Sequence, residues 1–72
     1  MSPLNQDPAS VTRAREWARM TRTELAKEAG LSLSLLSEIE SGTRNATPEK
    51  LGRIAEALNC PVSMLERKRV AS

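Results

Sequence analysis

Two short amphipathic segments, each closed by a glycine, constrain the fold of this chain more than any other feature. They lie between Thr21 and Arg44 and read TRTELAKEAGLSLSLLSEIESGTR. Thr21 and Glu24 have the T-x-x-E spacing of a capping box, in which both side chains bind free backbone amides where a helix begins. Gly30 follows, and glycine commonly ends helices because it adopts the left-handed conformation at little cost. The pattern therefore predicts a helix over about residues 22–29.

A second helix is predicted directly after this glycine, over about residues 33–41. Ser32 is a good N-cap residue, and Gly42 marks the end of the helix. Leu31 lies in the connection, as an apolar residue that can plug the space between the two helices. Two helices joined by a short turn that contains glycine are typical of a helix-turn-helix.

Further helices are predicted on both sides of this pair. Asp7-Pro8 provides an N-cap and a proline in the first turn, so a helix begins there and ends at about residue 18 or 19. Thr47-Pro48-Glu49 adds an acid near the positive end of the helix dipole and begins another helix, which ends near Asn59 in a left-handed conformation. Pro61 begins a short last helix.

The predicted fold class is all-α, because no strand pattern, repeat or low-complexity segment is present. We expect a compact bundle of five short helices over residues 7–66, preceded by a disordered tail (1–6) and followed by a basic tail (67–72). Trp17 is expected at the rim of the core. The residues expected to face inward are Val11, Ala14, Ala18, Leu25, Ala26, Ala29, Leu36, Ile39, Leu51, Ile54, Ala55, Leu58, Val62 and Leu65.

The chain resembles the Cro/repressor class of helix-turn-helix domains, also called the XRE family. The resemblance covers roughly residues 8–66 and implies a lambda-repressor-like DNA-binding domain with the helix-turn-helix at the second and third helices. It is carried by T-x-x-E-L-A at 21–26, A-G-L-S at 29–32, L-S-E-I-E-S-G at 36–42, T-P-E-K-L-x-x-I-A-x-A-L at 47–58 and P-V-S-M-L at 61–65.

The resemblance implies roles for three groups of residues. Arg15 and Glu40 would form a buried ion pair between the ends of the first and third helices; the alternative is two independent solvated charges. Phosphate contacts would come from Thr21, Arg22, Ser41, Thr43, Arg44 and Asn45. Base edges would be read by Leu33, Ser34, Ser37 and Glu38. Arg22 and Arg44 could instead be ordinary surface charges.

The predicted recognition helix, residues 33–41, is unusual because it has no Arg, Asn or Gln. Leu33 can meet a thymine methyl group, Ser34 can bind several bases, and Glu38 can accept from a cytosine amino group. A glutamate also repels phosphate unless an arginine lies beside it. We therefore expect weak base discrimination, or a site that is read partly through DNA shape. Leu33 and Leu35 could also contact protein, or one of them could pack inward.

The composition restricts the other classes of function. The formal net charge is +2 and Trp17 is the only aromatic residue, so the stacking surfaces used for single-stranded nucleic acid are missing. The chain has no histidine and one cysteine, Cys60, which leaves no zinc ligand set and no thiol–imidazole pair. We expect neither an enzyme nor a cofactor or metal site, and Cys60 is expected to be a small buried residue.

The leading hypothesis is a cytoplasmic, nucleoid-associated regulator of bacterial or phage type that binds double-stranded DNA as a homodimer. The short last helix, with Val62, Met64 and Leu65, or the basic run after residue 66 is the expected dimer surface; the basic run could also touch DNA. No apolar segment is long enough to span a membrane. The alternative is a protein-interaction module, such as an antitoxin or adaptor, that uses the same fold and its exposed leucines.

Overall fold

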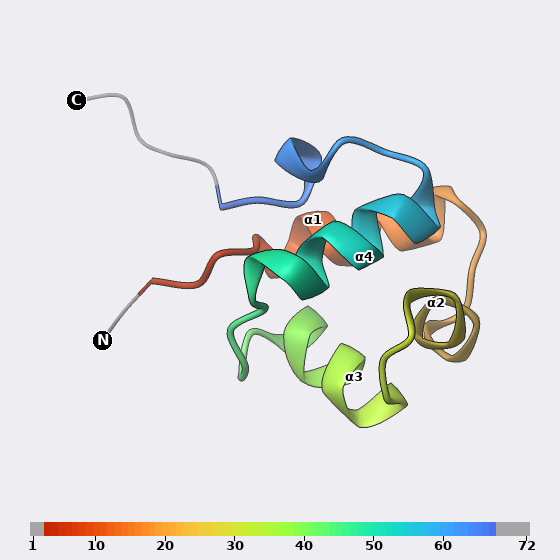
Figure 1. Ribbon diagram of the computed structural model, residues 1–72, viewed down its shortest axis with the longest axis horizontal. Coiled ribbons are helices and arrows are strands. Elements are labelled where there is room, and N and C mark those ends of the chain that lie inside the picture. Colours follow the sequence, from red (N-terminus) through yellow and green to blue (C-terminus); the bar gives the residue numbers. More distant parts are fainter. Residues whose placement is uncertain (1–2, 68–72) are drawn as a thin grey trace.

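Four α-helices and one 3-10 turn make up the described part of the chain, residues 3–67, in the computed structural model (Figure 1). They are α1 (Pro8–Trp17), α2 (Arg22–Ala29), α3 (Leu33–Ser41), α4 (Pro48–Leu58) and η1 (Val62–Met64). The all-α class is as predicted, and the bounds of α2 and α3 agree with the sequence analysis.

The fifth helix was predicted wrongly, because η1 is a single 3-10 turn of three residues. After this turn, the Leu65 carbonyl accepts a hydrogen bond from the Asp7 amide (2.8 Å) instead of continuing a helix. Gln6 and Glu66 then form an isolated antiparallel bridge. The N-terminal segment therefore ends the last helical element by pairing with it.

Side-chain caps begin three of the four α-helices. Both halves of the capping box between Thr21 and Glu24 are present, Ser32 accepts from the Leu35 amide (3.1 Å), and Thr47 accepts from the Lys50 amide (3.2 Å). Asp7 differs, because its carboxylate binds the Ser10 hydroxyl (2.8 Å) and no backbone amide of the first turn. Each cap of this kind typically stabilises a helix by about 1 kcal/mol.

Left-handed residues end α2, α3 and α4. Gly30 has φ 69°, Gly42 has φ 83° and Asn59 has φ 55°, as the sequence predicted. At Gly42 a side chain would also be crowded, since an added Cβ would lie 3.2 Å from Cγ of Pro8. Arg19, in the connection between α1 and α2, also has a positive φ (58°), which no glycine or asparagine in the sequence indicated.

The core is enclosed by all five elements: α4 packs against α2 and η1, and α3 packs against α1 and α2. In Figure 1, α4 crosses the middle of the molecule with α2 and α3 on one side and η1 on the other. The buried apolar residues are Val11, Leu25, Ala26, Ala29, Leu36, Ile39, Ala46, Leu51, Ile54, Ala55, Leu58 and Leu65. Ala18 and Val62 were expected in this core, but both are exposed, since they lie where α1 ends and where η1 begins.

The segment before α1 packs against the domain, which contradicts the predicted disordered tail for residues 3–6. The buried Gln6 side chain donates to the carbonyls of Ile39 (3.1 Å) and Arg44 (2.8 Å) and accepts from the Ala46 amide (3.0 Å). It thus pairs the Arg44 carbonyl and the Ala46 amide of the loop after α3, and it is a second donor to the Ile39 carbonyl, which also accepts from the Gly42 amide (3.3 Å). No local periodicity marks a residue that binds backbone forty positions away, so the sequence did not reveal it.

No helix in residues 3–67 could cross a bilayer: the longest, α4, has 11 residues.

We expect Gln6→Ala to lower the free energy of unfolding by about 2 kcal/mol, because buried backbone groups would lose their hydrogen-bond partners. Urea denaturation monitored by circular dichroism measures this change. Asn5→Ala is the control, since Asn5 is exposed and its side chain donates one hydrogen bond, to the Ala46 carbonyl. Equal effects of the two substitutions would show that the buried amide of Gln6 has no special role.

Candidate nucleic-acid interface

The outer face of α3 is formed by the four residues that were expected to read bases. Leu33 and Ser34 are exposed, while Ser37 and Glu38 are half-buried. Leu35 is also half-buried, and its side chain packs against the core. Two leucines were expected near this face. Leu35 packs against the core, and Leu33 remains exposed and can contact a partner.

The predicted ion pair between Arg15 and Glu40 is present. Arg15 Nε lies 2.9 Å from Glu40 Oε2, and Arg15 Nη2 lies 3.2 Å from Oε1. The Glu40 side chain is only 3% exposed. The pair therefore joins α1 to α3 within the interior and is not two independent solvated charges.

Two further groups bind the Glu40 carboxylate and were not foreseen. The Thr12 hydroxyl donates to Oε1 (2.9 Å), and Arg22 Nε approaches the same oxygen at 3.4 Å. Arg15 also donates to the Met20 carbonyl (2.9 Å). Thr12 lies three residues before Arg15, a spacing that places both on one face of a helix, and this signal could have identified it.

Arg22, in the first turn of α2, is a candidate phosphate ligand that contacts both the protein interior and solvent. Arg22 is 54% exposed although its Nε approaches Glu40, so much of its side chain remains open to a ligand. Thr21 is exposed, and its hydroxyl accepts from the Glu24 amide (3.1 Å), which leaves the hydroxyl proton free to donate.

Glu24 places a negative charge at the same helix terminus. Its carboxylate accepts from the Thr21 amide (2.8 Å), and this bond, together with the Thr21 side chain, holds the pKa of Glu24 below its usual value. Glu24 is therefore ionised at neutral pH. A phosphate at this terminus would depend on Arg22 and the Thr21 hydroxyl more than on free helix amides.

The loop after α3 folds back onto the end of that helix. The Thr43 amide donates to the Glu38 carbonyl (3.0 Å), and the Ser41 hydroxyl donates to the same carbonyl (3.1 Å). Asn45 uses its side-chain oxygen to accept from the Asn5 amide (2.7 Å), so its NH₂ group is what it can offer a phosphate. All four predicted loop residues, Ser41, Thr43, Arg44 and Asn45, are exposed.

Arg44 forms an ion pair with Glu38 on the outer face of α3. Arg44 Nε lies 2.8 Å from Glu38 Oε1, and the two side chains are 56% and 45% exposed. Glu38 was expected to repel phosphate unless an arginine lay beside it, and Arg44 is that arginine. The sequence did not reveal the pair because the left-handed Gly42 reverses the chain between the two residues.

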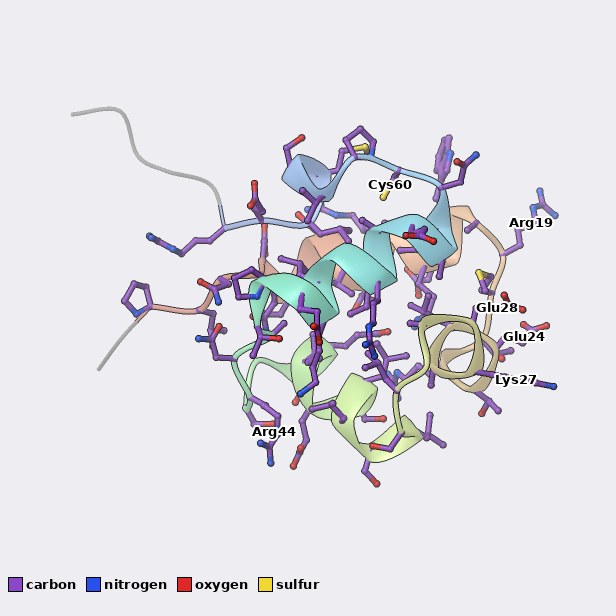
Figure 2. All side chains as sticks on the ribbon, viewed as in Figure 1. Arg19, Glu24, Lys27, Glu28, Arg44 and Cys60 are labelled. Carbon is purple, nitrogen blue, oxygen red and sulfur yellow. The ribbon has the colours of Figure 1, made fainter. Side chains whose placement is uncertain are left out.

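The face around the end of α1 differs from the prediction. Trp17 was expected at the rim of the core but is 91% exposed. Together with Ala14, Cys60 and Met64 it lines an open groove of about 710 Å³. Figure 2 shows Cys60 above α4 and Arg44 below it, beside α3. The groove and the outer face of α3 are thus separate surfaces.

Cys60 was expected to be a small buried residue and is less buried than that. It is half-buried and packs against the core, and burial raises the pKa of its thiol, which keeps the thiol protonated at neutral pH. Residues 3–67 contain no cluster of potential metal ligands.

The basic run after residue 66 lies almost wholly outside the described residues. Only Arg67 is described: it is exposed, and its amide donates to the Asn5 carbonyl (2.9 Å).

Comparison with known proteins agrees with this arrangement. The chain matches the family described as "Helix-turn-helix" over residues 11–65. It is similar to the clp gene regulator ClgR of C. glutamicum, with a TM-score of 0.74 and 30% identity over 78% of this chain and 73% of that one. No curated protein matches.

A second solved structure shares the fold. It is the restriction-modification controller protein C.AhdI of Aeromonas hydrophila, with a TM-score of 0.77 and 23% identity over 79% of this chain and 86% of that one.

We expect Arg15→Met to lower the free energy of unfolding by about 3 kcal/mol, because the buried carboxylate of Glu40 would lose its main partner. Arg15→Met combined with Glu40→Leu should recover most of this loss, since no buried charge would remain unpaired and Arg22, which also contacts Glu40, is half exposed to water. Chemical denaturation of the single and double variants measures both effects.

Arg53→Met is the matched control, because the ion pair of Arg53 with Glu49 is exposed; its loss should cost less than about 1 kcal/mol. If Arg15→Met cost no more than the control, the buried pair would not hold α1 against α3.

Proposed function

The chain belongs to the XRE-type helix-turn-helix family, and from this premise we propose that it is a transcriptional regulator that recognises specific sequences in double-stranded DNA. In this proposal α3 enters the major groove and α2 crosses the phosphate backbone. The observation that carries it is the outer face of α3, which offers Leu33, Ser34 and Glu38, together with two arginines held at the C-terminal half of that helix. Arg22 is held there by Glu40, and Arg44 by Glu38.

The two arginines would supply most of the electrostatic attraction. Phosphate contacts set the register of a protein on DNA but carry no sequence information by themselves. Arg22 and Arg44 are each more than half exposed, so both retain N–H groups that can reach phosphate oxygens. Thr21, Ser41, Thr43 and Asn45 would add hydrogen bonds beside them.

Base reading would depend on few groups. Leu33 would contact a thymine methyl group, Ser34 and Ser37 would form adaptable hydrogen bonds, and Glu38 would accept from a cytosine amino group. Because Leu35 is turned toward the core, it adds nothing to this face. A set of this size supports modest discrimination, with DNA shape supplying part of it.

We infer a homodimer, because one module of this size buries little surface on DNA and two modules can occupy half-sites about 34 Å apart. The surface proposed for the contact is η1, where Val62 and Met64 are exposed. Leu65 was part of the expected surface, but it is fully buried in the core and is unavailable to a second copy.

A protein-interaction module is the second candidate, and the exposure of Trp17 favours it. A lone tryptophan beside an apolar groove is unusual on a surface that touches only water, since exposed apolar patches commonly mark contact sites. This candidate would use the groove or Leu33. The two candidates differ in salt dependence, because binding to phosphates weakens steeply with salt and apolar docking does not.

Binding to a randomised duplex library at two salt concentrations, followed by sequencing of the retained DNA, tests the proposal. We expect an enriched motif with two-fold symmetry and weaker retention at high salt. Absence of retention at low salt would contradict DNA binding and leave the protein-interaction module as the better account. Enrichment of a single, asymmetric half-site would contradict the homodimer alone.

Arg22→Ala should weaken binding to all duplexes by a similar factor and make the negative slope of log affinity against log salt about 0.9 less steep, the value of one phosphate contact. Titration of fluorescent duplexes at several salt concentrations measures this slope. The fold should survive, because Glu40 keeps Arg15 and Thr12 as partners.

Arg13→Ala is the matched control. Arg13 is exposed and lines the groove beside Trp17, so its removal changes the net charge equally but away from α3. If both variants made the slope equally less steep, Arg22 would act only through net charge. The proposed position of α2 across the DNA phosphate backbone would then be wrong.

A further inference from the structure

We propose that Glu38 and Arg44 act as one unit that selects a cytosine in the major groove, so that Arg44 determines sequence selectivity as well as binding phosphate. This inference rests on the proposed function, since it requires α3 to lie in the major groove. It goes beyond that function because it couples a backbone contact to the reading of one base.

The contact between the two side chains uses one atom of each. Arg44 Nε donates to Glu38 Oε1 at 2.8 Å. Within residues 3–67, the remaining polar atoms of the two side chains have no hydrogen-bond partner: these are Arg44 Nη1 and Nη2 and Glu38 Oε2. Both side chains are about half exposed. The pair therefore offers solvent two nitrogens that can donate to phosphate and one oxygen that can accept from a base.

The free oxygen of Glu38 favours cytosine among the four bases. Cytosine presents its N4 amino group as a donor in the major groove, whereas guanine presents the acceptors O6 and N7, and thymine presents the acceptor O4. Adenine also has an amino group, but its N7 acceptor lies beside it and would repel a carboxylate. A carboxylate at this position therefore accepts best from cytosine.

Arg44 removes the electrostatic cost of this choice. A lone carboxylate near the phosphates is repelled, but here the guanidinium neutralises it through Nε and keeps Nη1 and Nη2 for a phosphate. An arginine suits this task because its planar guanidinium carries five N–H donors in fixed directions. Loss of Arg44 would leave Glu38 uncompensated, so its effect would depend on the base that faces Glu38.

The fold, rather than chance contact on the surface, holds Arg44 over Glu38. The left-handed Gly42 reverses the chain, and the Thr43 amide donates to the Glu38 carbonyl (3.0 Å). The buried Gln6 side chain donates to the Arg44 carbonyl (2.8 Å). The backbone of Arg44 is thus held by hydrogen bonds on both sides, at the preceding Thr43 amide and at its own carbonyl.

Arg22 provides the contrast. Its partner, Glu40, is buried and already binds Arg15 and Thr12, so that carboxylate cannot reach a base. Loss of Arg22 should therefore affect all sequences alike. The two arginines look equivalent in the sequence, but the structure predicts that only Arg44 influences base preference.

The test is a double-mutant cycle of wild type, Glu38→Gln, Arg44→Ala and the double variant. Each is titrated against the selected duplex and against duplexes with one base pair changed at a time. We expect Glu38→Gln to lose discrimination at one C·G pair by about 5-fold or more, the range of a single mismatch. Arg44→Ala should lose discrimination at that same pair, and should weaken binding about 3-fold less when Glu38 is already Gln.

Arg44→Lys separates charge from geometry. It keeps the positive charge, so the salt slope should stay near that of wild type, but lysine cannot bridge a carboxylate and a phosphate with a planar fork. Discrimination at the C·G pair should therefore fall. The matched control is the cycle of Glu49→Gln and Arg53→Ala, an exposed ion pair on α4, which should change neither affinity nor preference.

Two results would overturn the inference while leaving the proposed function intact. One is an equal loss of affinity for every base pair in Arg44→Ala, and the other is an additive cycle with Glu38→Gln. Failure of the wild-type protein to bind any duplex at low salt would instead overturn the proposed function and the inference together. Thermal unfolding of each variant, followed by circular dichroism, verifies that the fold is retained.

Discussion

The buried carboxylate of Glu40 is the interaction on which the arrangement of the first three helices depends. It binds Arg15 and Thr12 from α1 and Arg22 from α2, while its own backbone belongs to α3. A charge with 3% exposure is tolerated only when hydrogen bonds replace the water it has lost. The hydrogen bonds to this carboxylate therefore fix how α1, α2 and α3 sit relative to one another. Apolar packing in a small core is less specific about direction and adds stability to that arrangement.

This constraint also shapes the candidate interface. Because Glu40 binds Arg22, this half-exposed side chain lies beside α3. Two residues earlier in α3, Glu38 holds Arg44 in a similar way, but there the carboxylate remains half exposed. The two glutamates of α3 thus hold three arginines: the buried Glu40 binds Arg15 and Arg22, whereas the half-exposed Glu38 binds Arg44 and can still meet a ligand.

The N-terminal segment shows why a short chain benefits from every buried hydrogen bond. A domain of this size hides a modest fraction of its surface, so the loops carry a large share of the free backbone groups. Gln6 satisfies two such groups in the α3–α4 loop, the Arg44 carbonyl and the Ala46 amide, and the bridge to Glu66 ties the same segment to the end of η1. The loop that bears Arg44 is consequently part of the folded domain and not a loose connection.

The sequence by itself determined the local structure: the positions of α2 and α3, their caps and their left-handed ends follow from side chains that act within four residues of one another. The order of its motifs along residues 8–66 also carried the family resemblance. It also supplied the candidate pair of Arg15 and Glu40. Only the tertiary structure decided that Trp17 and Ala18 face solvent, that the last element is a single turn, that Gln6 is buried, and that Arg44 returns to Glu38. These depend on contacts between distant segments, and helical periodicity carries no information on which distant groups will meet.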